Sequence, residues 1–137
     1  GKENNPSVEF ITENVMNYDF KESFDLVTIL SGSYGYLKTK NEIMQLILKM
    51  IKWTKKGGNI YMELLPRFDS LGENGPFGSR IRIIDSNKWE YEDVGGVHVM
   101  NSPPLEFFER ILKKNFEDVT INGSTNNFKH IIAKNKK

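Results

Sequence analysis

Side chains suited to contacting a ligand follow an apolar run in the first third of the chain. Residues 25–30 are mostly apolar, and residues 31–36, Ser-Gly-Ser-Tyr-Gly-Tyr, combine small side chains with hydroxyl groups. Such a run predicts a central parallel strand covered on both faces, and open α/β sheets bind ligands where these strands end. Because small residues permit close approach, Ser33, Tyr34 and Tyr36 are candidates for contact with a substrate, and Tyr34 is also a candidate catalytic group. For each tyrosine the alternative is packing into the core.

Two further side chains are suited to moving a proton. The neutral imidazole of His98 can accept a proton from a substrate hydroxyl or ammonium near pH 7, and the alternative is an ordinary strand histidine. Glu63, at the end of a second apolar run, can position a substrate amine or accept a proton. Its alternative is a solvated or helix-capping role. His130 lies inside the last apolar run and is predicted to be structural.

The spacing of apolar residues predicts the elements that position these groups. Thr39 and Glu42 have the spacing of a capping box, so a helix is predicted from there to about Thr54. Either Gly57 or Gly58 is predicted to end it in the left-handed conformation. Apolar side chains share one helical face, namely Ile43, Leu46, Ile47, Met50 and Ile51. With residues 25–30 before it and 60–64 after it, this helix predicts two neighbouring parallel strands joined by a crossover.

The remainder of the chain predicts shorter elements. Residues 8–12 are β-branched and aromatic and predict a first strand. Residues 67–78 are rich in Gly, Pro and charge, and two alternating runs at 80–84 and 89–94 predict a hairpin, followed by residues 97–100. A last helix is predicted at 105–114, and closing strands at 119–121 and 129–133, joined by polar residues.

Residues 66–104 are therefore predicted to form an inserted lid or substrate-binding segment within one domain, residues 1–137. The hairpin also fits a docking edge for another subunit or a plain solvated face. Its Arg80, Arg82, Trp89 and Tyr91 are residue types that bind nucleic acid, but Glu90, Glu92 and Asp93 lower the local positive potential. Nucleic acid is not the expected partner.

Composition excludes several classes of function. The 137 residues, 38% hydrophobic and 27% charged, predict one globular domain, and the net charge of +1 gives no field that would attract nucleic acid or an anionic membrane. The chain has no Cys, which excludes disulfides and thiol nucleophiles, and its two His are too few for a histidine-only metal site. No apolar run approaches the roughly 18 residues of a membrane span. We expect a soluble, cytoplasmic protein without a metal.

The order of these elements, with Gly-Gly before the 60–64 run and Asn-Phe-Glu-Asp before the closing strands, resembles class I S-adenosylmethionine-dependent methyltransferases over nearly the whole chain. The resemblance implies a Rossmann-like α/β sheet of strand order 3-2-1-4-5-7-6. The chain would begin at strand 3 and lack strands 1 and 2 with the glycine-rich loop of the family. We therefore expect an N-terminally truncated domain, a second chain that supplies the missing strands, or strands that have re-paired.

The resemblance also implies the cofactor, S-adenosylmethionine, and some residues that hold it. Glu13 matches the family's acidic residue near the adenine amino group, and Asn14 matches the neighbour whose backbone N–H meets a ring nitrogen. For Glu13 the alternative is a solvated turn residue. Ser31 opens a loop similar to the serine-rich, Gly-Tyr loop of methyltransferases that act on small molecules, where it would line the cofactor site.

The predicted function is methyl transfer to a small-molecule acceptor. Methyl transfer from a sulfonium needs alignment and desolvation more than a strong catalytic group, so a missing catalytic motif does not count against it. The Asn-Pro-Pro-aromatic motif of amino-directed DNA methyltransferases is absent after the 25–30 run. The alternatives are a noncatalytic methyltransferase-like subunit, acting as a homodimer or with a partner chain, and another doubly wound protein.

Overall fold

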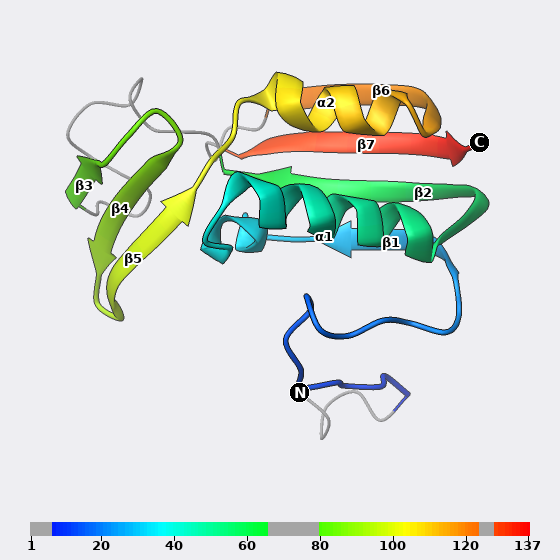
Figure 1. The fold of residues 1–137 in the computed structure, drawn as a ribbon, viewed down its shortest axis with the longest axis horizontal. Coiled ribbons are helices and arrows are strands. Elements are labelled where there is room, and N and C mark those ends of the chain that lie inside the picture. The colour runs from blue at the N-terminus through cyan, green and yellow to red at the C-terminus, as the bar shows by residue number, and fades with distance from the viewer. Residues whose placement is uncertain (1–6, 66–79, 124–127) are drawn as a thin grey trace.

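The computed structural model describes residues 7–65, 80–123 and 128–137 (Figure 1). Four strands form the main sheet, in the order β1 (Phe24–Ile29), β2 (Thr54–Leu64), β7 (Lys129–Lys136) and β6 (Phe116–Gly123). The first two are parallel, as predicted, and β7 runs antiparallel to both of its neighbours. The predicted connection 67–78 and residues 124–127 of the last connection lie outside the described residues.

The crossover helix α1 (Lys40–Trp53) begins where the capping box predicted it. Thr39 Oγ accepts a hydrogen bond from Glu42 N at 3.1 Å, and Glu42 Oε2 accepts from Thr39 N at 3.0 Å. Two backbone N–H groups that the helix cannot satisfy itself are thereby paired. The predicted apolar face is buried.

The prediction that a glycine ends α1 is wrong. The helix ends at Trp53 because Thr54 is already extended, with ψ 130°, and its hydroxyl donates to Met50 O at 2.8 Å, satisfying one of the last carbonyls. Gly57, with φ +76°, lies inside β2, where the register with β1 shifts between Phe24 and Leu26. Its left-handed conformation serves this irregularity and not the helix end.

The core lies between the sheet and two helices on one face, α1 and α2 (Leu105–Lys113) (Figure 1). The predicted last helix and closing strands are confirmed. Alternate positions of β2 are buried under the helices, namely Ile60, Met62 and Leu64. Side chains alternate along a strand, so Tyr61 and Glu63 project from the opposite face, where they are only partly buried.

The strand predicted at residues 8–12 does not form. These residues have no regular structure, and Phe10 and Ile11 are 40% and 42% exposed. An extended segment becomes a strand only when a neighbour takes its hydrogen bonds, and none of the described strands pairs with it. The segment is held to α1 further along: Trp53 Nε1 donates to Asp19 Oδ1 at 2.7 Å, and Lys52 forms an ion pair with Asp19.

The prediction that residues 25–30 form a central strand covered on both faces is also wrong for the described chain. β1 lies at the edge of the sheet, and Leu26 is 55% exposed. The observed order β1-β2-β7-β6 equals 4-5-7-6, the order that the resemblance implies for its last four strands. The described residues form no strand before β1. The full seven-strand order stays a prediction.

The predicted hairpin is confirmed and forms a separate three-stranded sheet with the strand after it. Strands β3 (Arg80–Ile83), β4 (Lys88–Asp93) and β5 (Gly96–Asn101) pair antiparallel in chain order. In the turn between β3 and β4, Asp85 Oδ1 accepts from Asn87 N and Lys88 N, each at 2.8 Å. The buried Trp89 ties this sheet to the main one, because its Nε1 donates to Ser102 Oγ, which donates to Leu65 O at the end of β2.

We expect Thr39→Ala to lower the free energy of unfolding by about 1 kcal/mol, because the Glu42 N–H loses its acceptor at the start of α1. Gln45→Ala, an exposed position on the same helix, serves as the control, with an effect within about 0.5 kcal/mol. Urea unfolding of both variants measures the difference. Equal stability of Thr39→Ala and the unsubstituted chain would contradict the role of the cap.

Candidate functional site

The loop that follows β1 is held by the carboxyl end of β2. Glu63 Oε2 accepts a hydrogen bond from Ser31 N at 2.8 Å, and Gly32 N donates to Glu63 O at 3.2 Å. Ser31 and Gly32 both have positive φ, 54° and 64°. A Cβ on Gly32 would lie 2.7 Å from Leu65 Cβ, so the tight turn requires glycine there. These contacts fix the backbone of the loop. The predicted cofactor residue Ser31 is exposed on it.

The three candidate residues of the 3-10 helix η1 (Ser33–Tyr36) lie in different environments. Ser33 is exposed, and its Oγ donates to Leu30 O at 2.7 Å. Tyr34 is 1% exposed: its hydroxyl donates to Leu65 O at 3.2 Å and its ring packs edge-on against Phe108. Burial raises the pKa of Tyr34 above its ordinary value. This position does not support a catalytic or substrate-binding role for Tyr34, and core packing describes it instead.

Tyr36 and His98, 62 residues apart in sequence, meet where η1 touches β5. The Tyr36 hydroxyl lies 3.1 Å from His98 Nδ1, and His98 Nε2 lies 3.1 Å from Asp93 Oδ1. The Tyr91 ring stacks on the imidazole with centroids 4.7 Å apart, and its hydroxyl lies 3.4 Å from that of Tyr36. Two predicted residues are therefore brought together.

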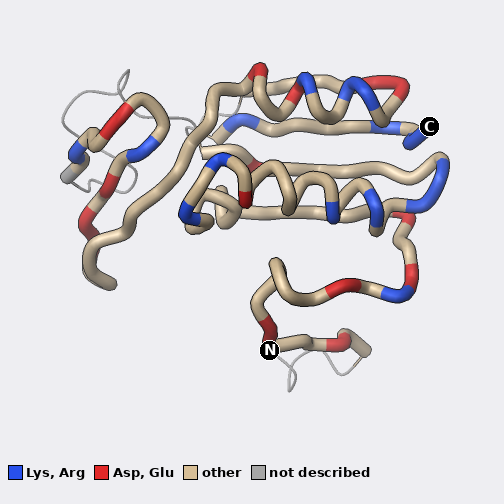
Figure 2. Tube along the Cα trace, viewed as in Figure 1, with Lys and Arg blue, Asp and Glu red and all other residues tan. Residues whose placement is uncertain are grey.

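Asp93 and Tyr91 are functional candidates that the sequence reasoning missed. The hydrogen bond from Gly95 N at 2.7 Å lowers the pKa of Asp93, and His98 lowers it further. Burial is the main cause of a raised pKa for Tyr91. The signal available in the sequence was the Gly95-Gly96 turn between the runs 89–94 and 97–100, which pair in the structure with Tyr91 directly opposite His98. Acidic residues gather on β4 around them (Figure 2).

Glu63, Tyr61 and His130 form a second polar cluster, on the face of the sheet opposite the helices. Glu63 Oε1 lies 3.3 Å from the Tyr61 hydroxyl, which lies 2.7 Å from His130 Nδ1. Both carboxylate oxygens are thus engaged by the protein itself. Within the described residues Glu63 acts on the loop after β1, and His130 has a polar partner on β2, in keeping with its predicted structural role.

Glu13 and Asn14 lie in a turn of the N-terminal segment. Glu13 Oε1 accepts from Asn14 N at 2.8 Å, and Asn14 Oδ1 accepts from Met16 N at 2.9 Å. Both side chains are exposed, as the solvated-turn alternative expected. No hydrogen bond among the described residues joins them to the loop 31–36. The next residue, Val15, lines the pocket beside β1.

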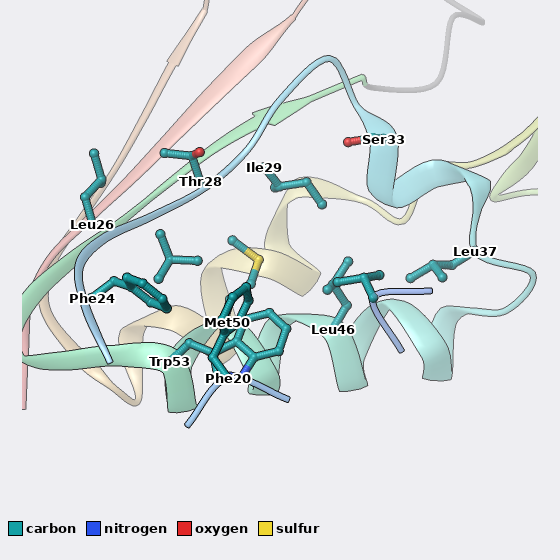
Figure 3. Close-up of a pocket in the computed structure, with 12 residues that line it drawn as sticks. Phe20, Phe24, Leu26, Thr28, Ile29, Ser33, Leu37, Leu46, Met50 and Trp53 are labelled. Carbon is teal, nitrogen blue, oxygen red and sulfur yellow. The ribbon is translucent and has the colours of Figure 1, made fainter. Parts of the chain in front are cut away.

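That pocket, of about 450 Å³, lies between the edge strand β1, helix α1 and the N-terminal segment (Figure 3). Most of its lining is apolar, with hydroxyl groups from Thr28 and Ser33. Its volume is within the range of small-molecule sites. The largest side chains in the lining are aromatic, namely Phe20, Phe24 and Trp53.

No group of three His, Asp or Glu residues in the described parts of the chain could hold a metal ion. Within those parts, no helix is long and apolar enough to cross a membrane.

The fold is that of known methyltransferases, although no family model and no curated protein matches the sequence. The S-adenosylmethionine-bound CalS10 of Micromonospora echinaspora, an amino pentose methyltransferase, superposes with TM-score 0.71 at 16% identity, over 98% of this chain and 68% of that one. An S-adenosylmethionine-dependent methyltransferase from Clostridium acetobutylicum gives TM-score 0.67 at 15% identity, over 93% and 64%. The sugar N-methyltransferase KedS8 of Streptoalloteichus gives 0.65 at 15%, over 91% and 61%.

These likenesses define the class of fold. The chain has the α/β fold of S-adenosylmethionine-dependent methyltransferases, and it spans about two thirds of the length of these three proteins. The resemblance noted in the sequence is confirmed at the level of the fold.

We expect Glu63→Ala to release the loop after β1, because Ser31 N loses its charged acceptor. Hydrogen exchange of the Ser31 amide should accelerate at least tenfold, and the free energy of unfolding should fall by about 1 kcal/mol. Glu63→Gln keeps a carbonyl oxygen in reach and is the matched control. Unchanged exchange at Ser31 in Glu63→Ala would contradict the proposed role of this carboxylate.

The depressed pKa of Asp93 predicts a pH dependence of stability with a definite sign. A carboxyl group whose pKa is lower in the folded state adds stability above its unfolded pKa of about 4 and loses it as pH falls through the folded value. The stability difference between the unsubstituted chain and Asp93→Asn should therefore shrink from pH 5 to pH 2 in urea unfolding. The series stays below pH 5, where histidine titration contributes little. A constant difference would argue against the lowered pKa.

Proposed function

We propose that this chain takes part in S-adenosylmethionine-dependent methyl transfer to a small-molecule acceptor, with the loop 31–36 at the transfer site. The observation that carries the proposal is the superposition of 98% of the chain on a methyltransferase with bound S-adenosylmethionine. In an open α/β sheet the ligand lies at the carboxyl ends of the strands. Loop 31–36 and Glu63 occupy that edge here.

Residues of the N-terminal segment and of loop 31–36 suit the cofactor chemically. The Glu13 carboxylate can accept a hydrogen bond from the adenine amino group, and the Asn14 backbone N–H can donate to a ring nitrogen. In the structure these two groups satisfy each other, at 2.8 Å, so binding would exchange one hydrogen bond for two. Ser31 and Ser33 add exposed hydroxyl groups on a loop whose small residues let a ligand approach the backbone closely. The aromatic pocket beside Val15 offers an apolar surface for a ring.

S-adenosylmethionine, when bound, supplies an electrophilic methyl group on sulfur. The task of the protein is then to align the acceptor in line with that group and to exclude water. Ser33, on η1, and Tyr36, whose hydroxyl contacts the hairpin sheet, are the side chains best placed to contact the acceptor. Glu63 contributes through the loop that it holds. Residues 66–104 then serve as the lid, of which residues 80–104, with strands β3 to β5, are described.

A small-molecule acceptor agrees with the proteins of similar fold. CalS10 is an amino pentose methyltransferase and KedS8 a sugar N-methyltransferase. On this chain we extend the proposal to an acceptor nitrogen on a small polar molecule. On β4, Glu90 is paired with Arg82, and the remaining acids, Glu92 and Asp93, suit a cationic acceptor better than the phosphates of nucleic acid.

A noncatalytic binding role is the second candidate, and one observation favours it. The edge of β1 carries exposed apolar side chains, with Leu26 and Leu30 55% and 49% exposed, and no described strand pairs with its outer side. A second copy or a partner chain could add a strand there. Such a subunit would support an active partner without binding the cofactor itself.

Calorimetry with S-adenosylmethionine on the complete polypeptide that contains this chain separates the two. The enzyme should bind the cofactor, and Glu13→Ala should weaken binding by about 1 to 3 kcal/mol because the adenine amino group loses its acceptor. Glu9→Ala, an exposed acid on the same segment, is the control. Absence of binding by the unsubstituted protein would favour the binding subunit. Unchanged affinity in Glu13→Ala would remove that residue from the site.

A further inference from the structure

We propose that Tyr36, His98 and Asp93 form a proton relay that deprotonates an amine acceptor before methyl transfer. The inference rests on the proposed function and adds the residues that would prepare an amine acceptor for it. The three groups lie in a row: the Tyr36 hydroxyl is 3.1 Å from one imidazole nitrogen, and Asp93 Oδ1 is 3.1 Å from the other.

When the imidazole of His98 is neutral, the row of Tyr36, His98 and Asp93 allows one arrangement of protons. An ionised carboxylate only accepts hydrogen bonds, so His98 Nε2 carries the proton that bonds Asp93. In neutral imidazole the other nitrogen, Nδ1, then accepts, and the Tyr36 hydroxyl must be its donor. The same logic orients the histidine of hydrolytic triads, in which the acid fixes the tautomer. The Asp93 carboxylate is itself anchored by Gly95 N at 2.7 Å, which keeps it ionised.

The open end of the relay is the Tyr36 oxygen. Tyr36 is 54% exposed, the most exposed side chain of the three-residue row. Its oxygen lies 3.4 Å from the Tyr91 hydroxyl, which can act as a donor toward it. After donating to His98 and accepting from Tyr91, this oxygen retains a lone pair for a proton from solvent or a ligand.

The row is held in place by both sheets. Tyr91 covers one face of the imidazole, with the two rings only 13° from parallel. Gly35, next to Tyr36, lets η1 press against β5, since a Cβ there would lie 2.5 Å from Met100 Cε and 3.2 Å from Asn101 O. Asn101 Nδ2 also donates to Leu37 O just beyond Tyr36. The described titratable groups that contact the His98 ring are Asp93 and Tyr91 on β4 and Tyr36 on η1.

The relay accounts for each proton and bond in the methylation of an ammonium acceptor. The acceptor N–H bond breaks and its proton passes to the Tyr36 oxygen, while the Tyr36 proton passes to His98 Nδ1, giving an imidazolium paired with Asp93. The nitrogen lone pair then forms a bond to the methyl carbon of the sulfonium, and the carbon–sulfur bond breaks with its electrons on sulfur. The products are a methylated ammonium and a thioether, and the imidazolium later returns its proton to solvent.

The strength of the base selects an amine over a hydroxyl. An aliphatic amine resembles lysine, with a pKa of about 10.4, and arrives protonated at pH 7, so it must lose a proton to become a nucleophile. The ordinary pKa of an imidazole group is about 6.5, so transfer of that proton to an imidazole has to overcome a pKa difference of about 4. An alcohol is closer to water, with a pKa of about 15.7, and lies far outside the range of an imidazole base. Tyr36 is the catalytic residue, and His98 and Asp93 are positioning residues that act through it.

The arrangement of protons can be tested without any turnover. Long-range proton–nitrogen NMR of the chain should show His98 as the Nε2–H tautomer at pH 8. Asp93→Asn should change the populations of the two tautomers, whereas Asp118→Asn, an exposed acid on β6, should leave them as they are. A predominant Nδ1–H tautomer in the unsubstituted chain would overturn the relay whether or not the protein is a methyltransferase.

The role in transfer is tested on the complete polypeptide with S-adenosylmethionine, and with glucosamine and glucose as probe acceptors. Transfer to glucosamine should exceed transfer to glucose, and Tyr36→Phe and Asp93→Asn should each lower kcat about 100-fold at pH 7 without changing cofactor affinity. The deficit should shrink to within about fivefold at pH 10, where roughly a quarter of an amine with a pKa of about 10.4 is deprotonated in solution. A merely structural role would give a deficit independent of pH.

The outcomes separate this inference from the proposed function. Failure of the unsubstituted protein to bind S-adenosylmethionine would defeat the methyltransferase itself. If the cofactor binds, two outcomes would overturn the assignment of an amine acceptor. One is transfer to glucose as fast as to glucosamine, and the other is transfer to neither sugar. Full activity of Tyr36→Phe and Asp93→Asn at pH 7, or a deficit that persists at pH 10, would overturn the relay.

Discussion

The carboxyl end of β2 accepts the hydrogen bonds on which the rest of the candidate site depends. Glu63 accepts from the backbone of Ser31 through its side chain and from Gly32 through its carbonyl. Two residues further on, the Leu65 carbonyl accepts from the hydroxyls of Tyr34 and Ser102. One strand end therefore holds both the loop after β1 and the connection from β5 to α2. Groups that the linear sequence keeps far apart are fixed against one short piece of backbone.

This arrangement explains how an exposed site can be rigid. Tyr36 and His98 are only partly covered, but each belongs to a segment whose neighbouring residue is buried. Tyr34 is enclosed in the core two residues before Tyr36, and Met100 is enclosed on the same strand as His98, two residues after it. Buried side chains fix the backbone, and the polar tips then meet at the surface with little remaining freedom. The small hairpin sheet thus behaves as a part of the site.

The predictions succeeded where the interactions join residues close in sequence, and they failed where the interactions join residues far apart. Helix α1 was predicted well because a capping box and a 3.6-residue apolar period act between residues three or four positions apart. Its end near Thr54 was also predicted, but the terminating residue was not, since the Thr54 hydroxyl satisfies a helix carbonyl before any glycine is reached. The strand predicted at residues 8–12 failed for a different reason. A β-prone segment needs a partner strand, and none of the described strands provides one.

The sequence by itself determined the local elements, the parallel unit around α1 and the residue types of the site, because periodicity and capping act over a few positions. Only the tertiary structure decided that Tyr34 is buried while Tyr36 is exposed, and that His98 lies between Tyr36 and Asp93. The contact of Tyr36 with His98 joins residues 62 positions apart. No local pattern encodes such a pair, because it depends on how two distinct sheets pack at the same strand end.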